Sequence, residues 1–112
     1  MEAALRAIAE PRRREILRLV WDAERSAGEI ASHFEVTRPA ISQHLRVLRE
    51  AGLVSERRDG TRRIYRARPE GLEELRRFLD GFWAESLAAL KREAELEERR
   101  MDAGGEDRHH HP

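Results

Sequence analysis

Apolar residues recur along the chain with two different periods, and these periods mark out its predicted elements. In the stretch TRPAISQHLRVLR, Ile41, Leu45 and Leu48 fall on one helical stripe. Thr37 can cap the start of this helix with its hydroxyl, and Gly52 can end it because glycine enters the left-handed conformation without a Cβ penalty. The opposite side carries arginines, an amide and a hydroxyl but no carboxylate. Such groups can grip phosphates and hydrogen-bond to base edges, although a merely basic solvated face has the same pattern.

Two helices are predicted near the N-terminus. Leu5 and Ile8 indicate the first, over roughly residues 2–9. Pro11 fits the first turn of the second, where its missing N–H costs no hydrogen bond. The apolar face of the second helix consists of Ile16, Leu17, Val20 and Trp21. The three arginines at residues 12–14 oppose the helix dipole, and they are interpreted either as a solvated cluster or as contacts to a DNA backbone.

A third, short helix is predicted directly before the basic one. Ser26 and Glu29 match the capping-box pattern S-x-x-E, which begins a helix of about two turns. Glu35 and Val36 then make a tight connection into the next helix. Two short helices joined in this way, the second basic on its outer face, predict a helix-turn-helix arrangement.

After the basic helix, strand-like residues replace the helical period. Residues 53–58 and 62–67 are predicted strands, and Asp59-Gly60 between them is a strong hairpin signal because Gly60 supplies a positive φ. A lone two-stranded ribbon is marginally stable, so the hairpin must pack on the helices. The expected anchors are Leu53, Ile64 or Tyr65. The tip would project as a wing able to lie along phosphates.

Pro69 opens a last helix with a heptad-like seam, whose apolar residues fall at alternating steps of three and four. The seam comprises Leu72, Leu75, Leu79, Phe82, Ser86 and Leu90, and Phe78, Trp83 and Leu87 broaden it. Carried to Arg100, this helix would have 32 residues and a length of ~48 Å. Gly81 inside it either permits close approach of another helix or marks a bend. An apolar stripe of this length is longer than a small helix-turn-helix domain needs to cover its core, which favours self-association.

The formal net charge of zero conceals a strong asymmetry. Residues 1–68 hold 15 Arg and 10 acidic residues, whereas residues 69–112 hold 7 basic and 12 acidic ones. Within residues 37–68 the excess is largest, with 9 Arg against 3 acidic residues. A basic patch on a neutral protein is the electrostatic footprint of a polyanion binder.

Other function classes find little support in the sequence. The 112-residue chain has no cysteine, so it lacks disulfides, thiolate metal sites and a cysteine nucleophile. No apolar run approaches the ~18 residues of a membrane span, and no signal-peptide pattern precedes the first helix, so we expect a soluble cytoplasmic protein. No Gly-rich phosphate loop or catalytic constellation is recognisable, and an enzyme is not expected.

A family resemblance covers roughly residues 3–90. The stretches LRAIAEPRRREIL and EIASHFEVTRPAISQHLRVLREAGLVSERRDGTRRIYR, with the following long helix containing FW, resemble the ArsR/SmtB winged-helix repressors. This resemblance implies a homodimer whose first and last helices form the interface and which places two helix-turn-helix units in consecutive major grooves of an inverted-repeat operator. The branch most resembled, with RPAISQHL and GTRRIYR, implies a repressor that is often autoregulatory and without a metal.

The chain departs from the metal-sensing relatives in two places. Their cysteine motif near the helix-turn-helix is absent, where this chain reads SAGEIASHF, and residues 69–100 contain no histidine for the site of the last helix. Glu10 also stands where the family often has Asp or Asn before the helix proline. No metal site and no cofactor are therefore expected.

We thus predict a mainly α fold with a small β-hairpin, a homodimeric winged helix-turn-helix, for a sequence-specific double-stranded DNA-binding regulator, most simply a repressor. The winged-helix domain with both dimerisation helices would span residues 1–92, followed by a charged helix end at 93–101 and a disordered tail at 102–112. The residues expected to contact DNA are Thr37, Arg38, Pro39, Ser42, Gln43, Arg46, Arg49, Arg57, Arg58, Thr61, Arg62 and Arg63. The residues expected at the dimer interface are Leu5, Ile8, Leu72, Leu75, Leu79, Phe82, Trp83, Leu87 and Leu90.

Alternatives to this prediction remain open. The same fold could be a protein-interaction module whose basic helix and hairpin bind an acidic protein surface. A repressor could also hold a small-molecule effector between the dimer helices near Phe78 and Trp83. His44 is interpreted as half-buried and hydrogen-bonded to the backbone, in preference to a base contact. The run His109–His111 is interpreted as part of a flexible tail, with weak transition-metal binding as the alternative.

Overall fold

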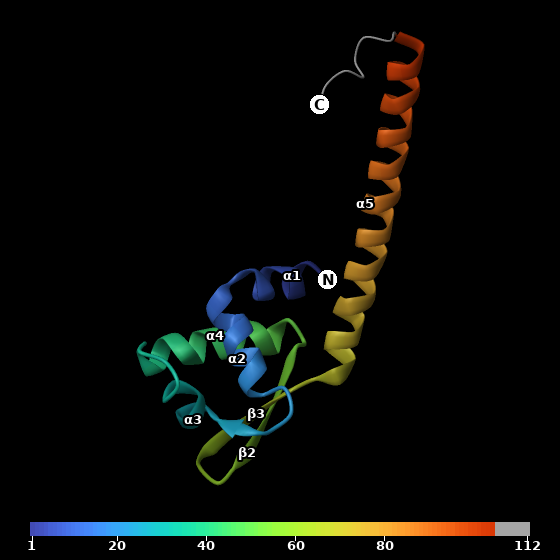
Figure 1. Cartoon of the computed structure of the whole chain (residues 1–112). Helices are drawn as coiled ribbons and strands as arrows, with labels where there is room; N and C mark the ends of the chain where they lie inside the picture. The colour runs from blue at the N-terminus through green and yellow to red at the C-terminus, as the bar shows by residue number, and fades with distance from the viewer. Residues whose placement is uncertain (105–112) are drawn as a thin grey trace. The chain divides into compact units, whose positions relative to one another are not determined.

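A computed structural model of the chain describes residues 1–104, and the His109–His111 run lies outside the described residues. The elements in chain order are α1 (Glu2–Ala9), α2 (Pro11–Leu19), β1 (Arg25–Ser26), α3 (Ala27–Ala31), α4 (Arg38–Glu50), β2 (Val54–Asp59), β3 (Arg62–Ala67) and α5 (Pro69–Gly104) (Figure 1). The chain divides into two compact units, the first spanning Met1–Arg77 and the second beginning at Phe78. This architecture confirms the mainly helical winged helix-turn-helix fold.

The helix boundaries follow from side chains that satisfy backbone groups. At α3 the predicted capping box is present, since the Ser26 hydroxyl accepts from the Glu29 backbone N–H at 3.1 Å and the Glu29 carboxylate accepts from the Ser26 N–H at 2.7 Å. The Thr37 hydroxyl caps α4 by accepting from the Ala40 N–H at 3.3 Å. After α4, Gly52 adopts a φ of 78°. These contacts satisfy backbone N–H and C=O groups that have no partner within the helix, as the sequence predicted.

The core of the first unit brings the helices and the sheet together. Its largest fully buried side chains are Ile16, Val20, Ile30, Ile41, Leu45, Leu48, Leu53 and Val54. One sequence prediction was wrong here. Trp21 lies beyond the end of α2, and 57% of its surface is exposed, so it is not part of the apolar face of that helix. Leu75, expected at the dimer interface, is only 6% exposed and belongs to this core.

The wing belongs to a three-stranded antiparallel sheet with the strand order β1-β3-β2. The hairpin of β2 and β3 was predicted, and Gly60 at its turn has the expected positive φ of 66°. All three expected anchors, Leu53, Ile64 and Tyr65, are buried. The two-residue strand β1 was missed because Arg25 and Ser26 are too few to show alternation, and their pairing with β3 comes from distant sequence.

Two of the three arginines at the start of α2 bind the end of α1. Arg13 Nε donates to the Ala7 carbonyl at 2.7 Å, and Arg14 Nη1 donates to the Ile8 carbonyl at 2.7 Å. Carbonyls in the last turn of a helix lack intrahelical partners, and cations are favourable at that end of the helix dipole. These two side chains therefore cap α1, which neither interpretation from the sequence foresaw.

Helix α5 begins in the first unit and supplies the described part of the second. Large apolar side chains along the second unit are exposed by 38–64%: Phe78, Leu79, Phe82, Trp83, Leu87, Leu90, Leu96 and Met101. The helix ends at Gly104, so its last residues overlap the tail predicted from residue 102. Among residues 1–104 no helix is both long enough and apolar enough to cross a bilayer.

Candidate nucleic-acid interface

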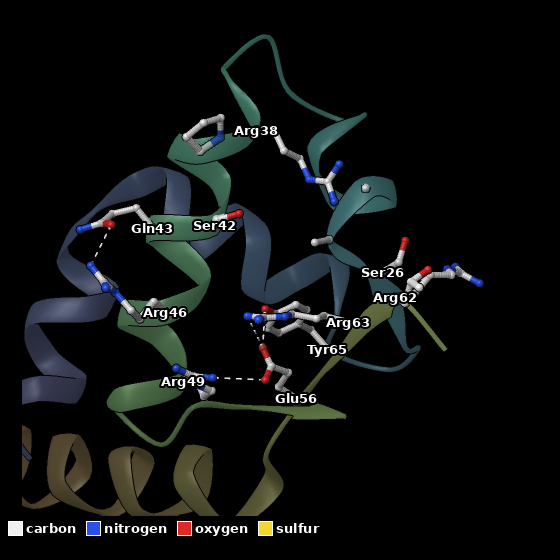
Figure 2. Close-up of a pocket in the computed structure, with 14 residues that line it drawn as sticks. Ser26, Arg38, Ser42, Gln43, Arg46, Arg49, Glu56, Arg62, Arg63 and Tyr65 are labelled. Atoms are coloured by element: carbon white, nitrogen blue, oxygen red, sulfur yellow. Dashed lines mark hydrogen bonds and ion pairs between the residues drawn. The ribbon is translucent and has the colours of Figure 1, made fainter. Parts of the chain in front are cut away.

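A cleft of about 670 Å³ lies between α4, the start of α3 and the hairpin, all within the first unit (Figure 2). Nine of the twelve residues predicted to contact DNA line it: Arg38, Pro39, Ser42, Gln43, Arg46, Arg49, Thr61, Arg62 and Arg63. The other three, Thr37, Arg57 and Arg58, do not. Residues from two separate stretches of sequence thus share one basic surface, which we call the arginine cleft.

The α4 side of the arginine cleft combines a charged end with hydrogen-bonding groups. The guanidinium of Arg38 lies across the backbone of Gly28, close to the start of α3. Ser42 extends from the middle of α4, and Arg46 Nη2 donates to Gln43 Oε1 at 3.0 Å one turn along the same helix. This side therefore presents amide, hydroxyl and guanidinium groups, which suit both base edges and phosphates.

The floor of the arginine cleft contains a carboxylate that sequence reasoning did not single out. Glu56 stands directly opposite Tyr65 across β2 and β3, and its Oε2 accepts from the Tyr65 hydroxyl at 2.7 Å. Arg49 Nη1 donates to Glu56 Oε1 at 3.2 Å, and Arg63 Nη1 lies 3.5 Å from Oε2. The pKa of Glu56 is lowered chiefly by the Tyr65 hydrogen bond and by these two cations. The hairpin register could have suggested this pair with the turn placed at Gly60-Thr61, because Glu56 and Tyr65 are equidistant from those two residues.

Two wing arginines pair with acids outside the hairpin. Arg57 Nε and Nη2 donate to both carboxylate oxygens of Glu24 at 2.9 and 2.7 Å, which lowers the pKa of Glu24 and raises that of Arg57. Arg62 Nη2 lies 3.5 Å from Glu29 Oε1, near the cap of α3. Arg57 is thus held in a bidentate pair away from the arginine cleft, whereas Arg62 lines it.

His44 links α4 to the N-terminal helices. The residue is half-buried, as predicted, but its partner is a side chain and not the backbone: Nδ1 lies 3.2 Å from Arg13 Nη1. Because a guanidinium only donates, Nδ1 must be the unprotonated acceptor. Burial, followed by the positive charge of Arg13, lowers the pKa of His44, while Glu10 opposes this shift.

The residues expected at the dimer interface fall into two groups. Leu79, Phe82, Trp83, Leu87 and Leu90 are exposed in the second unit. In the first unit, Leu5, Ile8 and Leu72 are partly buried against the core, which already encloses Leu75. Among the described residues, these side chains of the second unit are therefore the exposed members of the predicted interface, by 38–64% of their surfaces.

Within the described residues, no three His, Cys, Asp or Glu side chains come together in a way that could hold a metal ion. The whole sequence also lacks cysteine. The donors that soft or borderline transition metals prefer are therefore not gathered anywhere in residues 1–104.

Comparisons with known proteins agree with this geometry. Residues 10–56 match the family described as "Bacterial regulatory protein, arsR family". The chain is 44% identical over 106 residues to the HTH-type transcriptional regulator Rv2034 of Mycobacterium tuberculosis, covering 95% of this chain and 92% of that protein. It is 42% identical over 60 residues to the transcriptional repressor SdpR of Bacillus subtilis, covering 54% of this chain and 67% of the repressor. A crystal structure of a possible transcriptional regulator for arsenical resistance has a TM-score of 0.70 and 47% identity, covering 80% of this chain and 94% of that one.

Proposed function

Since the chain belongs to the ArsR family of bacterial DNA-binding transcription regulators, we propose that it is a homodimeric repressor that binds an inverted-repeat operator through the arginine cleft. A dimer of this kind would place its two α4 helices in successive major grooves, about 34–36 Å apart. Repression would follow from occlusion of the promoter, which the resemblance to autoregulatory members suggests is its own.

The observation that carries this proposal is the composition of the arginine cleft. Five arginines from α4 and β3 share it with the hydroxyl of Ser42 and the amide of Gln43. In this division of roles Arg38, Ser42 and Gln43 read base edges, and the arginines nearer the hairpin contact phosphates. Phosphate contacts would supply much of the affinity and make it strongly dependent on salt.

The exposed stripe of α5 supports the homodimer. Phe82, Trp83 and Leu90 expose 54%, 62% and 64% of their surfaces. Contiguous apolar surface of this kind is unfavourable in water unless another surface covers it, and a second copy of the same stripe follows the heptad-like spacing. The two arginine clefts would then be related by a two-fold axis, as an inverted repeat requires.

Independence from metal ions is part of the proposal. It is supported by the absence of cysteine from the sequence and of histidine from residues 69–100, which leaves the metal-sensing motifs of relatives without their ligands. We expect zinc, cadmium or arsenite to leave a preformed protein–DNA complex intact in an electrophoretic shift assay. Release of DNA by any of these ions at stoichiometric concentration would contradict this part.

The main test is selection of bound sites from random duplex DNA, followed by transcription in vitro from a promoter that carries the selected site. We expect an inverted repeat with half-sites about one helical turn apart, and reduced transcript on adding the protein. Increased transcript would identify an activator. Failure to bind any duplex at low salt would favour the protein-interaction alternative and overturn the proposal.

The dimer is tested with a matched pair of substitutions on α5. Leu90→Glu places a charge on the heptad-like seam, whereas Ala88→Glu places the same charge at a residue that is also exposed but lies on the opposite side of the helix, about 200° from Leu90. Sedimentation equilibrium should show dissociation for Leu90→Glu and a wild-type dimer for Ala88→Glu. A monomeric wild type in dilute solution would refute the assembly.

A further inference from the structure

Among the residues that line the arginine cleft, Glu56 carries the single negative charge, against five arginines. Its side chain is 17% exposed, whereas those of Arg49 and Arg63 are 41% and 52% exposed. The carboxylate therefore sits beneath two cations that reach solvent. It also connects elements that are separate in sequence, because Arg49 belongs to α4 and Arg63 to β3.

The carboxylate is fixed from below by a buried partner. Tyr65 is 6% exposed and donates its hydroxyl to Glu56 Oε2 at 2.7 Å. This hydrogen bond is the main reason that the pKa of Glu56 is lowered, and Glu56 also contributes to the raised pKa of Tyr65, after burial. Tyr65 thus stays a neutral donor and Glu56 stays an anion at neutral pH. The negative charge is a fixed part of the surface.

A fixed anion beneath two phosphate-facing cations has a definite consequence for DNA binding. It cancels one unit of positive charge wherever the protein lies on DNA, whatever the base sequence. It also holds Arg49 and Arg63 in one arrangement, so that their remaining N–H groups are already oriented when a phosphate arrives. The cancelled charge lowers the affinity for DNA of every sequence. The fixed arrangement of Arg49 and Arg63 favours the position of the protein on DNA in which the phosphates meet their N–H groups.

We propose that Glu56, anchored by Tyr65, is a specificity-determining positioning residue of the DNA interface, which limits binding to non-operator DNA while it orders Arg49 and Arg63 for the operator. The inference rests on the proposed role of the arginine cleft. Glu56 acts through the two arginines and need not touch DNA itself.

The test compares Glu56→Gln with wild type on two labelled duplexes, the selected operator and a scrambled sequence, over a range of salt concentrations. The amide keeps an oxygen for the Tyr65 hydroxyl but removes the charge. For the scrambled duplex we expect affinity at ~0.1 M salt to rise about three- to tenfold and the slope of log K against log salt to steepen by about 0.9 per Glu56. Operator affinity should rise less, so the ratio of operator to scrambled affinity falls.

Glu73→Gln is the matched control, because it also removes a carboxylate that pairs with two arginines, Arg76 and Arg77, but outside the arginine cleft. It should leave the ratio of affinities and the salt slope unchanged. Tyr65→Phe keeps the charge and removes the anchor, so it should leave the slope unchanged while lowering operator affinity. Thermal unfolding of each variant establishes that it is folded.

Two results would overturn the inference while leaving the proposed function intact. One is a Glu56→Gln variant with the wild-type salt slope and an unchanged ratio of affinities. The other is an equal change in Glu73→Gln, which would show only the effect of net charge. If the wild type bound neither duplex, the proposed function would be refuted, and the inference would be refuted with it.

Discussion

Two glycines of α5 should respond in opposite ways to the same substitution. A Cβ added at Gly71 would overlap the backbone carbonyl oxygen of Gly52, in the turn that follows α4. No side-chain rotation relieves a clash with backbone, so either α5 or the turn must move. Overpacking of this kind costs about 1–3 kcal/mol, and alanine regains up to about 1 kcal/mol of helix propensity. For Gly71→Ala we therefore expect a net loss of about 1–2 kcal/mol in the free energy of unfolding.

Gly81 provides the control within the same helix, because a Cβ added there meets no atom within 4 Å. Gly81→Ala should therefore raise the free energy of unfolding by about 0.5–1 kcal/mol through helix propensity alone. Both variants are measured by urea denaturation at one fixed protein concentration, since assembly would shift the midpoint. A Gly71→Ala variant as stable as wild type would refute the steric reasoning. A destabilised Gly81→Ala would instead indicate that a second helix approaches closely at this position.

Three further predictions follow from contacts in the first unit. Ser26→Ala removes the α3 cap and should lower the free energy of unfolding, measured by urea denaturation, by about 1 kcal/mol. An unchanged free energy would contradict a stabilising role of the capping box. Because the pKa of His44 is lowered in the fold, the free energy of unfolding should fall as pH drops below about 6.5 and become constant below the folded pKa. His44→Gln should flatten this part of the plot of free energy against pH. An unchanged plot would exclude His44 as the source of the pH dependence. Arg57→Ala should leave the salt dependence of DNA binding unchanged because Glu24 holds Arg57 outside the arginine cleft, whereas Arg63→Ala should make the slope of log K against log salt shallower by about 0.9 per protomer. Equal slopes for the two variants would refute this distinction.

Most elements of the fold could be predicted because each has a local cause. The caps at Ser26 and Thr37, the glycines with positive φ and the apolar stripe of α4 all act within a few residues, and the structure confirms each of them. The error came where the local pattern is ambiguous. Trp21 fits the apolar period of α2, but the helix ends before it and its side chain is exposed. Leu75 fits the apolar seam of α5, and the core of the first unit also encloses it.

A basic helix and a basic hairpin could be predicted from consecutive residues, because periodicity, turn chemistry and charge act between neighbours in the chain. Which arginines act together depends on how the elements pack. Pairing of β2 with β3 set Glu56 opposite Tyr65, and packing of α4 on the sheet brought Arg49 to the same carboxylate, while Arg57 was drawn to Glu24. The three contacts span 7, 9 and 33 positions of the chain and join separate parts of the fold, so their geometry depends on how the elements pack. A count of charges along the sequence therefore could not separate the cations of the arginine cleft from those paired elsewhere.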